Sequence, residues 1–324
     1  MPAARSTAGA IVMGGGVYTA LLTFLPSPPS TGFALGLVLL SMYMPFYFDG
    51  RPLRHDAYNK SIVCWPYWAW FWVNLLGLPQ GRVELDEKAA ESFKDPKAQR
   101  IYSSHPHGVG SLHHMGLMLT PPVCQEGHSF EKISPGATRR DLAASVLFRI
   151  PILRELALAA GGVDASRSVV ERMLRKGLSI GVLTGGEQEQ ILSAKGEHTV
   201  YIMKRKGIMK LALKHGVPIV PCYCFGETDL YDQSKVALGL RKQIVKQLGL
   251  AITLACGRNP LLPFLPHRVA MVQVVGKPIP SKKTAEPSQV EIDALHAKYV
   301  KGLREVFDNN KARLGYPDAE LVVV

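Results

Sequence analysis

The stretch QRIYSSHPHGVGSLHHMGLML, residues 99–119, decides the fold class of this chain. An apolar, β-prone lead-in at Ile101 and Tyr102 runs into the turn His105-Pro106-His107-Gly108, and an apolar, helix-like run follows from Leu112 to Leu119. The pattern predicts a strand, a tight turn and a helix, a junction that lies at the carboxyl edge of an open α/β sheet, where ligands bind. Because proline fixes φ and glycine lets a substrate approach the backbone, we expect this turn to be functional.

The remainder of the chain after Gly81 alternates between strand-like and helix-like segments. Such alternation predicts a mainly parallel sheet flanked by helices. Strands are expected over Arg82–Leu85, Gly161–Asp164, Ser179–Thr184, Pro218–Phe225 and Val269–Val275. Helices are expected over Lys88–Phe93, Arg139–Phe148, Ile152–Ala160, Arg167–Lys176, Gly207–His215 and Val290–Leu314.

The N-terminus carries two uncharged runs, residues 9–25 and 31–48, joined by the proline-rich corner Pro26-Ser27-Pro28-Pro29-Ser30. Each run is near the lower limit of about 17 residues for crossing a bilayer core, so the pair predicts a membrane helical hairpin. Basic residues flank the pair on both sides and place both ends in the cytosol. They are Arg5, Arg51, Arg54 and Lys60. A cleaved signal peptide and a soluble pair of core helices are the alternatives.

Residues 61–79 contain all four tryptophans of the chain. Tryptophan favours the headgroup level of a membrane, so this segment is predicted to lie in the interface, with a buried aromatic helix as the alternative. The chain therefore divides into residues 1–80, a membrane hairpin with the Trp-rich segment, and residues 81–324, a catalytic domain.

Composition narrows the partners of the protein. With 38 basic and 26 acidic residues the formal charge is +12, which suits an anionic membrane face or a phosphorylated substrate. Nucleic acid is not expected, because no arginine–aromatic stripe is present. The five cysteines lack a framework spacing and are expected to be reduced. Cys222 and Cys224 alternate on one face of a predicted strand, which favours core packing over a metal site.

Four constellations have catalytic potential. Histidine suits general base catalysis near neutral pH, which makes His105 and His107 candidates. Gly185-Gly186-Glu187-Gln188-Glu189 follows a predicted strand and offers a carboxylate that could orient an imidazole. Lys204-Arg205-Lys206-Gly207 precedes a predicted helix and suits an anion. A fourth strand runs into Phe225-Gly226-Glu227.

Alternative chemistries find less support. His105, His107, His113 and His114 could bind zinc, but no cysteine or carboxylate joins them at ligand spacing, so no metal is expected. The one G-x-S-x-G match, residues 177–181, lies at the start of a predicted strand rather than on a strand-to-helix turn, which argues against a serine hydrolase. The chain has no G-x-x-x-x-G-K-[ST] loop, which argues against an ATPase.

Taken together, HPHG, GGEQE, KRKGIMKLALKHG and PIVPCYCFGETDLY resemble the acyl-CoA:diacylglycerol acyltransferase type 2 family, which includes monoacylglycerol and wax-ester synthesising relatives. The resemblance covers nearly the whole chain. It implies an enzyme of the endoplasmic reticulum membrane and the lipid droplet surface, whose active domain faces the cytosol and whose core is like that of glycerophosphate acyltransferases. Where the family often has small residues and an Asn-Phe pair, this chain has Ser111-Leu112-His113-His114-Met115, which bears on acceptor preference.

The resemblance also assigns roles. Its histidines fall on His105 and His107, and its glutamate on Glu189 rather than Glu187. The hypothesis is that His107 is the general base, oriented by Glu189, with His105 as a structural or alternative base and a Gly108 N–H facing the oxyanion. The remaining residues divide between two roles. Arg205, Lys206, Arg139 and Arg140 would hold the phosphates of coenzyme A, and Pro106, Gly185, Gly186, Gly226 and Glu227 would support the motifs.

The implied reaction transfers an acyl group from acyl-CoA, a co-substrate, to the free hydroxyl of diacylglycerol and makes triacylglycerol. No cofactor is expected. A monoacylglycerol or fatty-alcohol acceptor is the first alternative, because each acceptor needs an apolar pocket. A non-enzymatic lipid-binding or droplet-targeting protein with the same hairpin is the second. The sequence leaves a homo-oligomer open.

Overall fold

A computed structural model of the chain describes residues 29–54, 58–248 and 251–324. The first apolar run, residues 9–25, lies outside the described residues. The second run forms the helix α2 (Pro29–Tyr47), along which apolar side chains from Leu35 to Met42 are exposed. Among the described residues, no helix combines the length and the apolar character needed to span a membrane, so the helical hairpin stays a prediction.

The central element is a seven-stranded sheet with the strand order β1-β10-β7-β2-β5-β3-β4. Its strands are β1 (Arg82–Leu85), β2 (Ile101–His105), β3 (Arg139–Ala143), β4 (Gly162–Asp164), β5 (Ser179–Leu183), β7 (Ile219–Phe225) and β10 (Val272–Val275). Five of these strands are mutually parallel: β7, β2, β5, β3 and β4. β10 pairs with β7 in an antiparallel manner, and β1 pairs with β10 in a parallel manner. The predicted mainly parallel sheet is confirmed.

Two small sheets and the helices complete the described part of the fold. β6 (Thr199–Val200) pairs with β11 (Val322–Val323), and β8 (Asp232–Gln233) pairs with β9 (Ala255–Cys256). The α-helices after α2 are α3 (Lys60–Val63), α4 (Tyr67–Trp70), α5 (Phe130–Ile133), α6 (Leu153–Ala159), α7 (Arg167–Arg175), α8 (Gly186–Leu192), α9 (Gly207–His215), α10 (Leu238–Leu248) and α11 (Gln289–Lys311). Short 3-10 helices are η1 (Arg51–Leu53), η3 (Glu87–Phe93), η5 (Pro121–Val123), η6 (Gly136–Thr138), η7 (Leu147–Arg149) and η8 (Glu227–Leu230), and π-helices are η2 (Phe71–Leu75) and η4 (His114–Met118).

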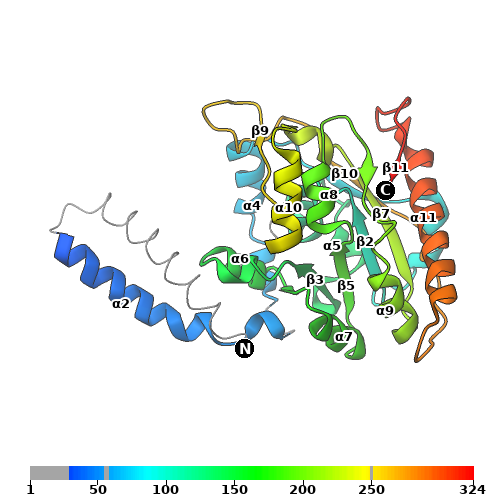
Figure 1. Cartoon of the computed structure of the whole chain (residues 1–324), viewed down its shortest axis with the longest axis horizontal. Coiled ribbons are helices and arrows are strands. Elements are labelled where there is room, and N and C mark those ends of the chain that lie inside the picture. The colour runs from blue at the N-terminus through cyan, green and yellow to red at the C-terminus, as the bar shows by residue number, and fades with distance from the viewer. Residues whose placement is uncertain (1–28, 55–57, 249–250) are drawn as a thin grey trace.

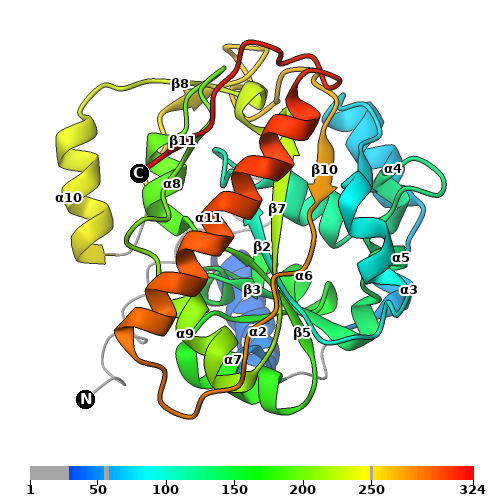
Figure 2. The ribbon, with the colours of Figure 1, turned by 90° about the vertical axis from the view of Figure 1, so that its right-hand side faces the viewer.

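The two faces of the sheet bury separate apolar clusters. On one face α7, α9 and α11 pack against the strands, and Figure 2 shows α11 crossing in front of β7. The other face is covered by η2, η3, η4 and α5. Because side chains alternate along a strand, neighbouring residues such as Ile101 and Tyr102 enter different clusters. Cys222 and Cys224 both lie in the second cluster, as predicted for core residues.

Local signals fix the helix ends. α7 ends before Gly177, whose φ is +75°, and α9 ends before Gly216, whose φ is +69°. Glycine is favoured at these positions because it adopts the left-handed backbone conformation with little strain. Ser288 and Glu291 form a reciprocal capping box at the start of α11. These three predicted helices are confirmed to within a few residues.

The predicted helix over Arg139–Phe148 is wrong. Residues Arg139–Ala143 form β3, which pairs with β5 on one side and with β4 on the other. Arg139 Nε donates to Asp141 Oδ2 at 3.0 Å, and this two-residue spacing places both side chains on one face of a strand. Backbone pairing with two neighbours outweighs the helix propensity of the alanines and leucines here.

The Trp-rich segment is partly buried and partly exposed. Trp72 is only 4% exposed, and its ring lies so close over Gly116 that a Cβ there would come within 2.4 Å of it. Trp65 and Trp70 are more than half exposed. The alternative of a buried aromatic helix therefore holds for Trp72, and Trp65 and Trp70 keep the interfacial prediction open. Figure 1 places α4 of this segment on the same side of the sheet as α2 and α6.

Candidate active site

Three adjacent strands deliver the predicted motifs to one edge of the sheet. β2 lies between β5 and β7, and all three end at the same carboxyl edge. His105 ends β2, Gly185-Gly186 follow β5, and Gly226-Glu227 follow β7. The expectation that the histidine turn faces a carboxylate from a later strand is met at this edge. Figure 1 shows α8, the helix that follows β5, beside β2.

Glu189 holds His105. The carboxylate oxygens of Glu189 each lie 3.0 Å from His105 Nδ1, and both side chains are almost completely buried. Glu189 also accepts the backbone N–H of His107 at 2.6 Å and that of Tyr201 at 2.7 Å. Burial alone would raise the pKa of Glu189, but the His105 ring and these donors hold the pKa below its ordinary value. Glu189 is therefore an anion that orients His105 and fixes the turn.

The Gly185-Gly186 pair makes room for this carboxylate. A Cβ on Gly185 would come within 2.1 Å of Glu189 Oε2, and Gly186 has a φ of +57°. The glycines thus serve the approach of Glu189 to the turn rather than direct binding.

The two ring nitrogens of His105 differ in their surroundings. Nδ1 faces Glu189, whereas the buried Nε2 has no hydrogen-bond partner in the described part of the chain. When Nδ1–H donates to a carboxylate, Nε2 carries the lone pair and can accept a proton. A buried polar atom without a partner is costly, so Nε2 of His105 marks the position at which a substrate hydroxyl would complete the site.

Glu189 does not orient the His107 ring, which corrects the predicted geometry. Only the backbone N–H of His107 reaches Glu189, while its ring Nδ1 lies 3.0 Å from Ser111 Oγ. The reason is the turn: His105 is still part of β2 and faces α8, whereas His107 lies beyond Pro106 and its ring turns toward Ser111. Burial lowers the pKa of His107, and the Gly108 carbonyl and Glu189 offset part of that effect. The ring of His107 is half-buried.

Gly108 lies against a second glutamate. Its φ is +64°, and a Cβ would come within 2.3 Å of Glu227 Oε1. No hydrogen bond from its N–H is found within the described residues, and the oxyanion contact stays a prediction. Pro106, the second residue of the turn, is joined to His105 by a cis peptide bond.

Glu227 caps the start of the helix that follows the turn. Its oxygens accept the backbone N–H groups of Leu112 at 3.1 Å and His113 at 2.8 Å. The His113 Nδ1 lies 3.1 Å from Glu227 Oε2, without hydrogen-bond geometry, and His113 Nε2 lies 3.2 Å from Ser104 Oγ. A carboxylate at the start of a helix is favourable because it meets unpaired N–H groups. Gly226, with a φ of +90°, provides the turn that places Glu227.

Sequence reasoning missed the contacts of Gln190 and Ser111 and the pairing of His113 with Glu227. Gln190 Nε2 donates to the Val109 carbonyl at 2.7 Å and so holds the segment that follows His107 and Gly108. Its position next to Glu189 on α8 is the one signal that the sequence offers. The sequence does not indicate that His113 pairs with Glu227, because the two residues are 114 positions apart in the chain.

The predicted phosphate-binding cations do not gather at one place. The Arg205 guanidinium lies within about 4 Å of a Cβ position on Gly186 and 5.8 Å from the Tyr201 ring, beside the site. Lys206 is close by but pairs with Asp293 at 2.7 Å. Arg139 and Arg140 start β3 at the opposite edge of the sheet, are buried, and donate to backbone carbonyls. The structure therefore moves Arg139 and Arg140 away from the site.

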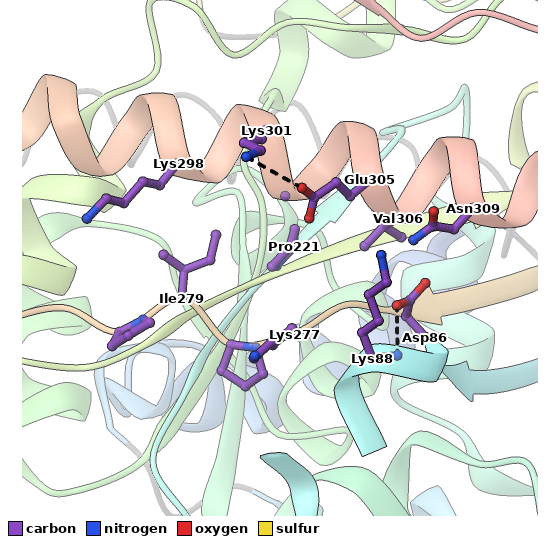
Figure 3. A pocket seen from close by; sticks show the side chains of 13 residues that line it. Asp86, Lys88, Pro221, Lys277, Ile279, Lys298, Lys301, Glu305, Val306 and Asn309 are labelled. Carbon is purple, nitrogen blue, oxygen red and sulfur yellow. Dashed lines mark hydrogen bonds and ion pairs between the residues drawn. The ribbon is translucent and has the colours of Figure 1, made fainter. Parts of the chain in front are cut away.

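A shallow pocket lies away from this edge, between α11 and the segment after β10 (Figure 3). Four lysines line it together with Asp86 and Glu305. None of the predicted site residues lines this pocket, so it is separate from the His105–Glu189 pair.

Comparison with known proteins identifies relatives over most of the chain. A family model described as diacylglycerol acyltransferase matches residues 31–324. Mouse "2-acylglycerol O-acyltransferase 1" is 30% identical over 299 residues, which cover 87% of this chain and 85% of that protein. Mouse "Diacylglycerol O-acyltransferase 2" is 33% identical over 236 residues, or 69% of this chain and 60% of that protein.

One solved structure shows a weaker likeness. The 1-acyl-sn-glycerophosphate (LPA) acyltransferase PlsC of Thermotoga maritima has a TM-score of 0.44 and 17% identity, and the match covers 82% of this chain and 88% of that chain. The predicted resemblance of the core to glycerophosphate acyltransferases stays a prediction at this level of likeness.

Proposed function

Because the chain belongs to the diacylglycerol acyltransferase family, and is thus an acyl-CoA-dependent O-acyltransferase, we propose that it acylates the free hydroxyl of diacylglycerol with His105 as general base. The observation that supports the base is the asymmetry of the His105 ring. Glu189 holds Nδ1, and Nε2 is buried without a partner among the described residues.

The proposed reaction balances with residues of the site. The acceptor hydroxyl gives its proton to His105 Nε2 while its oxygen attacks the thioester carbonyl carbon. The Gly108 N–H faces the resulting oxyanion, a type of contact worth about 3 kcal/mol when preorganised. The carbon–sulfur bond then breaks, and the leaving thiolate of coenzyme A takes up the proton from His105. Neither a cofactor nor a metal ion takes part.

His107 has a supporting role in this proposal. Its backbone N–H ties the turn to Glu189, and its ring is held by Ser111 rather than by a carboxylate. A neutral imidazole with a lowered pKa is a weaker base than one that a glutamate assists. The geometry therefore favours His105 over His107.

Arg205 is the favoured anchor for the phosphates of coenzyme A. No carboxylate pairs with its guanidinium within the described residues, whereas Lys206 is already paired with Asp293. Guanidinium groups bind phosphate in a bidentate manner. The resemblance to the family supports a location at the endoplasmic reticulum membrane and the lipid droplet surface, with the active domain in the cytosol. The two apolar runs and the charge of +12 suit a membrane in general.

A monoacylglycerol acceptor is the second candidate, because 2-acylglycerol O-acyltransferases align over more of their length than the diacylglycerol enzymes do. A competition assay separates the two. The purified protein is given labelled acyl-CoA and equal amounts of diacylglycerol, 2-monoacylglycerol and a long-chain alcohol. We expect mainly labelled triacylglycerol. If the main product were labelled diacylglycerol or wax ester, the acceptor would be monoacylglycerol or the alcohol instead. Lipid binding without any labelled product would contradict the proposed reaction.

A further inference from the structure

The loop Asn259–Leu265, between β9 and β10, carries apolar side chains on its outside. Leu261 is 90% exposed, Phe264 is 63% exposed, and Leu262 is also exposed. Single exposed apolar residues are ordinary on protein surfaces, but several neighbours on one loop mark an interaction site.

This loop is ordered by its own hydrogen bonds. Gly257 N donates to the Pro263 carbonyl at 2.8 Å, and Arg258 N donates to the Leu265 carbonyl at 3.0 Å. A Cβ on Gly257 would overlap with the Leu265 carbonyl, so the two ends of the loop are in close contact. The backbone thus keeps the apolar tips pointing outward, where they cannot fold back to bury themselves.

Arg258 joins the loop to the Trp-rich segment. Its guanidinium donates to the Leu76 carbonyl at 2.6 Å and lies against Gly77. The exposed apolar residues before this contact include Trp65, Trp70 and Leu75. We call the exposed side chains of Trp65, Trp70, Leu75, Leu261, Leu262 and Phe264 the apolar rim.

The rim also adjoins the catalytic turn. The Tyr231 hydroxyl donates to the Phe264 carbonyl at 2.8 Å, and the Tyr231 ring lies 4.0 Å from the Cβ position of Gly110. Gly110 is three residues after His107 in the turn that Glu189 and Gln190 hold. A single side chain therefore connects the rim to the site.

We propose that the apolar rim docks on a phospholipid bilayer and so places the mouth of the site at the membrane surface. This inference rests on the proposed function, in which the acceptor is a lipid dissolved in that membrane. Tryptophan, leucine and phenylalanine together are typical of an interfacial anchor, and the charge of +12 favours an anionic surface. The rim is also on the side of the sheet from which the apolar helix α2 extends (Figure 1).

A depth measurement on the full-length protein tests the docking directly. The partly exposed Cys64 and Cys256 are replaced by serine, Leu261→Cys is introduced, and its thiol receives a nitroxide label. The matched control labels Val290→Cys on α11, which is equally apolar and well exposed but lies away from the rim. In phosphatidylcholine–phosphatidylserine nanodiscs, we expect the Leu261 label to be relaxed by oxygen more than by a water-soluble nickel chelate, and the Val290 label to show the reverse.

Two other outcomes would overturn the proposal. A Leu261 label as open to the chelate as the Val290 label would show that the loop faces water. A label shielded from both reagents would show that protein, such as a second copy of the chain, covers it.

An activity assay separates this inference from the proposed function. We expect the triple variant Leu261→Ser, Leu262→Ser and Phe264→Ser to lose about tenfold in activity on diacylglycerol in vesicles but less than about twofold on a water-soluble short-chain diacylglycerol. Equal activity of variant and native protein on vesicles would contradict the docking alone. No product from the native protein with any acceptor would contradict the proposed function, and the nitroxide result would still decide the docking.

Discussion

Two buried histidine–glutamate pairs lie on either side of one turn, and they differ in what the far ring nitrogen meets. In the first pair, Glu189 takes Nδ1 of His105, and Nε2 has no partner in the described chain. In the second, Glu227 lies beside Nδ1 of His113, and Nε2 contacts Ser104. The same two residue types thus leave the far ring nitrogen without a partner in His105 and in contact with a serine in His113.

The glutamates differ as well. Glu189 accepts two backbone N–H groups and also contacts the Nδ1 atom of His105, so it links the turn to the His105 ring. Glu227 accepts the two N–H groups that begin the following helix and packs on Gly108. The comparison shows that a buried His–Glu pair is by itself no sign of catalysis. The pairs differ in which ring nitrogen lacks a hydrogen-bond partner: in His105 it is Nε2, which points away from Glu189, and in His113 it is Nδ1, which faces Glu227.

The largest effect is expected from a substitution that disrupts the His105–Glu189 pair. His105→Asn should lower kcat by about 10²- to 10⁴-fold, the usual contribution of a general base. His113→Asn is the matched control in the second pair and should keep a rate within about tenfold of the native value. Steady-state kinetics with acyl-CoA and diacylglycerol measure both. If His107→Asn abolished activity while His105→Asn kept it, His107 would be the base.

The next largest effect comes from the carboxylate of the first pair. Glu189→Gln should lower kcat by about 10²-fold, since a neutral amide neither fixes the tautomer nor stabilises the imidazolium. The KM for acyl-CoA should change little, and a defect confined to KM would argue for a binding role.

Glu189→Gln should also change how the free energy of unfolding depends on pH. The lowered pKa of Glu189 means that its contribution to stability is present above its ordinary pKa of 4.5 and is lost as the pH falls through the depressed value. The difference in unfolding free energy between native protein and Glu189→Gln should therefore shrink below pH 4.5. A constant difference down to pH 3 would contradict this linkage.

A smaller effect is expected from the carboxylate of the second pair. Glu227→Gln keeps one acceptor oxygen but loses the charge at the start of the helix, so we expect a loss of about 1–2 kcal/mol in unfolding free energy. Denaturant titration in detergent micelles measures it. If Glu227→Gln left stability unchanged but abolished acyl transfer, Glu227 would take part in the reaction rather than cap the helix.

His114 lies outside both pairs, and its effect is expected only at acidic pH. It is buried, its Nδ1 has no partner among the described residues, and burial lowers its pKa from 6.5 to about 4. The folded protein therefore resists protonation of His114, whereas the unfolded chain accepts it. Stability should fall as the pH drops from 6.5 toward 4, by at most about 1.4 kcal/mol per pH unit from this group.

The control for that pH dependence is His114→Gln, which removes the titrating ring. Denaturant titrations at pH 7.0, 6.0 and 5.0 should show a shallower fall in stability for His114→Gln than for the native protein. Parallel curves for the two proteins would show that His114 titrates normally in the folded state.

Local sequence patterns predict six of the seven strands of the central sheet, most of the longer helices, and the sheet edge that carries the His105–Glu189 pair. The Ile101–His105 strand, the Gly177 and Gly216 helix stops and the Gly185-Gly186 turn are local features, because side-chain alternation and left-handed glycines act within a few residues. The segment Arg139–Ala143 could not be predicted in this way, since its strand is fixed by β4 and β5 rather than by its own composition.

Which carboxylate contacts which histidine depends on long-range packing. His105 and His107 are two residues apart and have the same chemistry, so the choice depends on where Glu189 lies after α8 packs beside β2. The same holds for His113 and Glu227, and for Arg139, which a sheet register carries to the opposite edge. A sequence lists the groups that can donate and accept a proton, and long-range packing alone sets the distances between them.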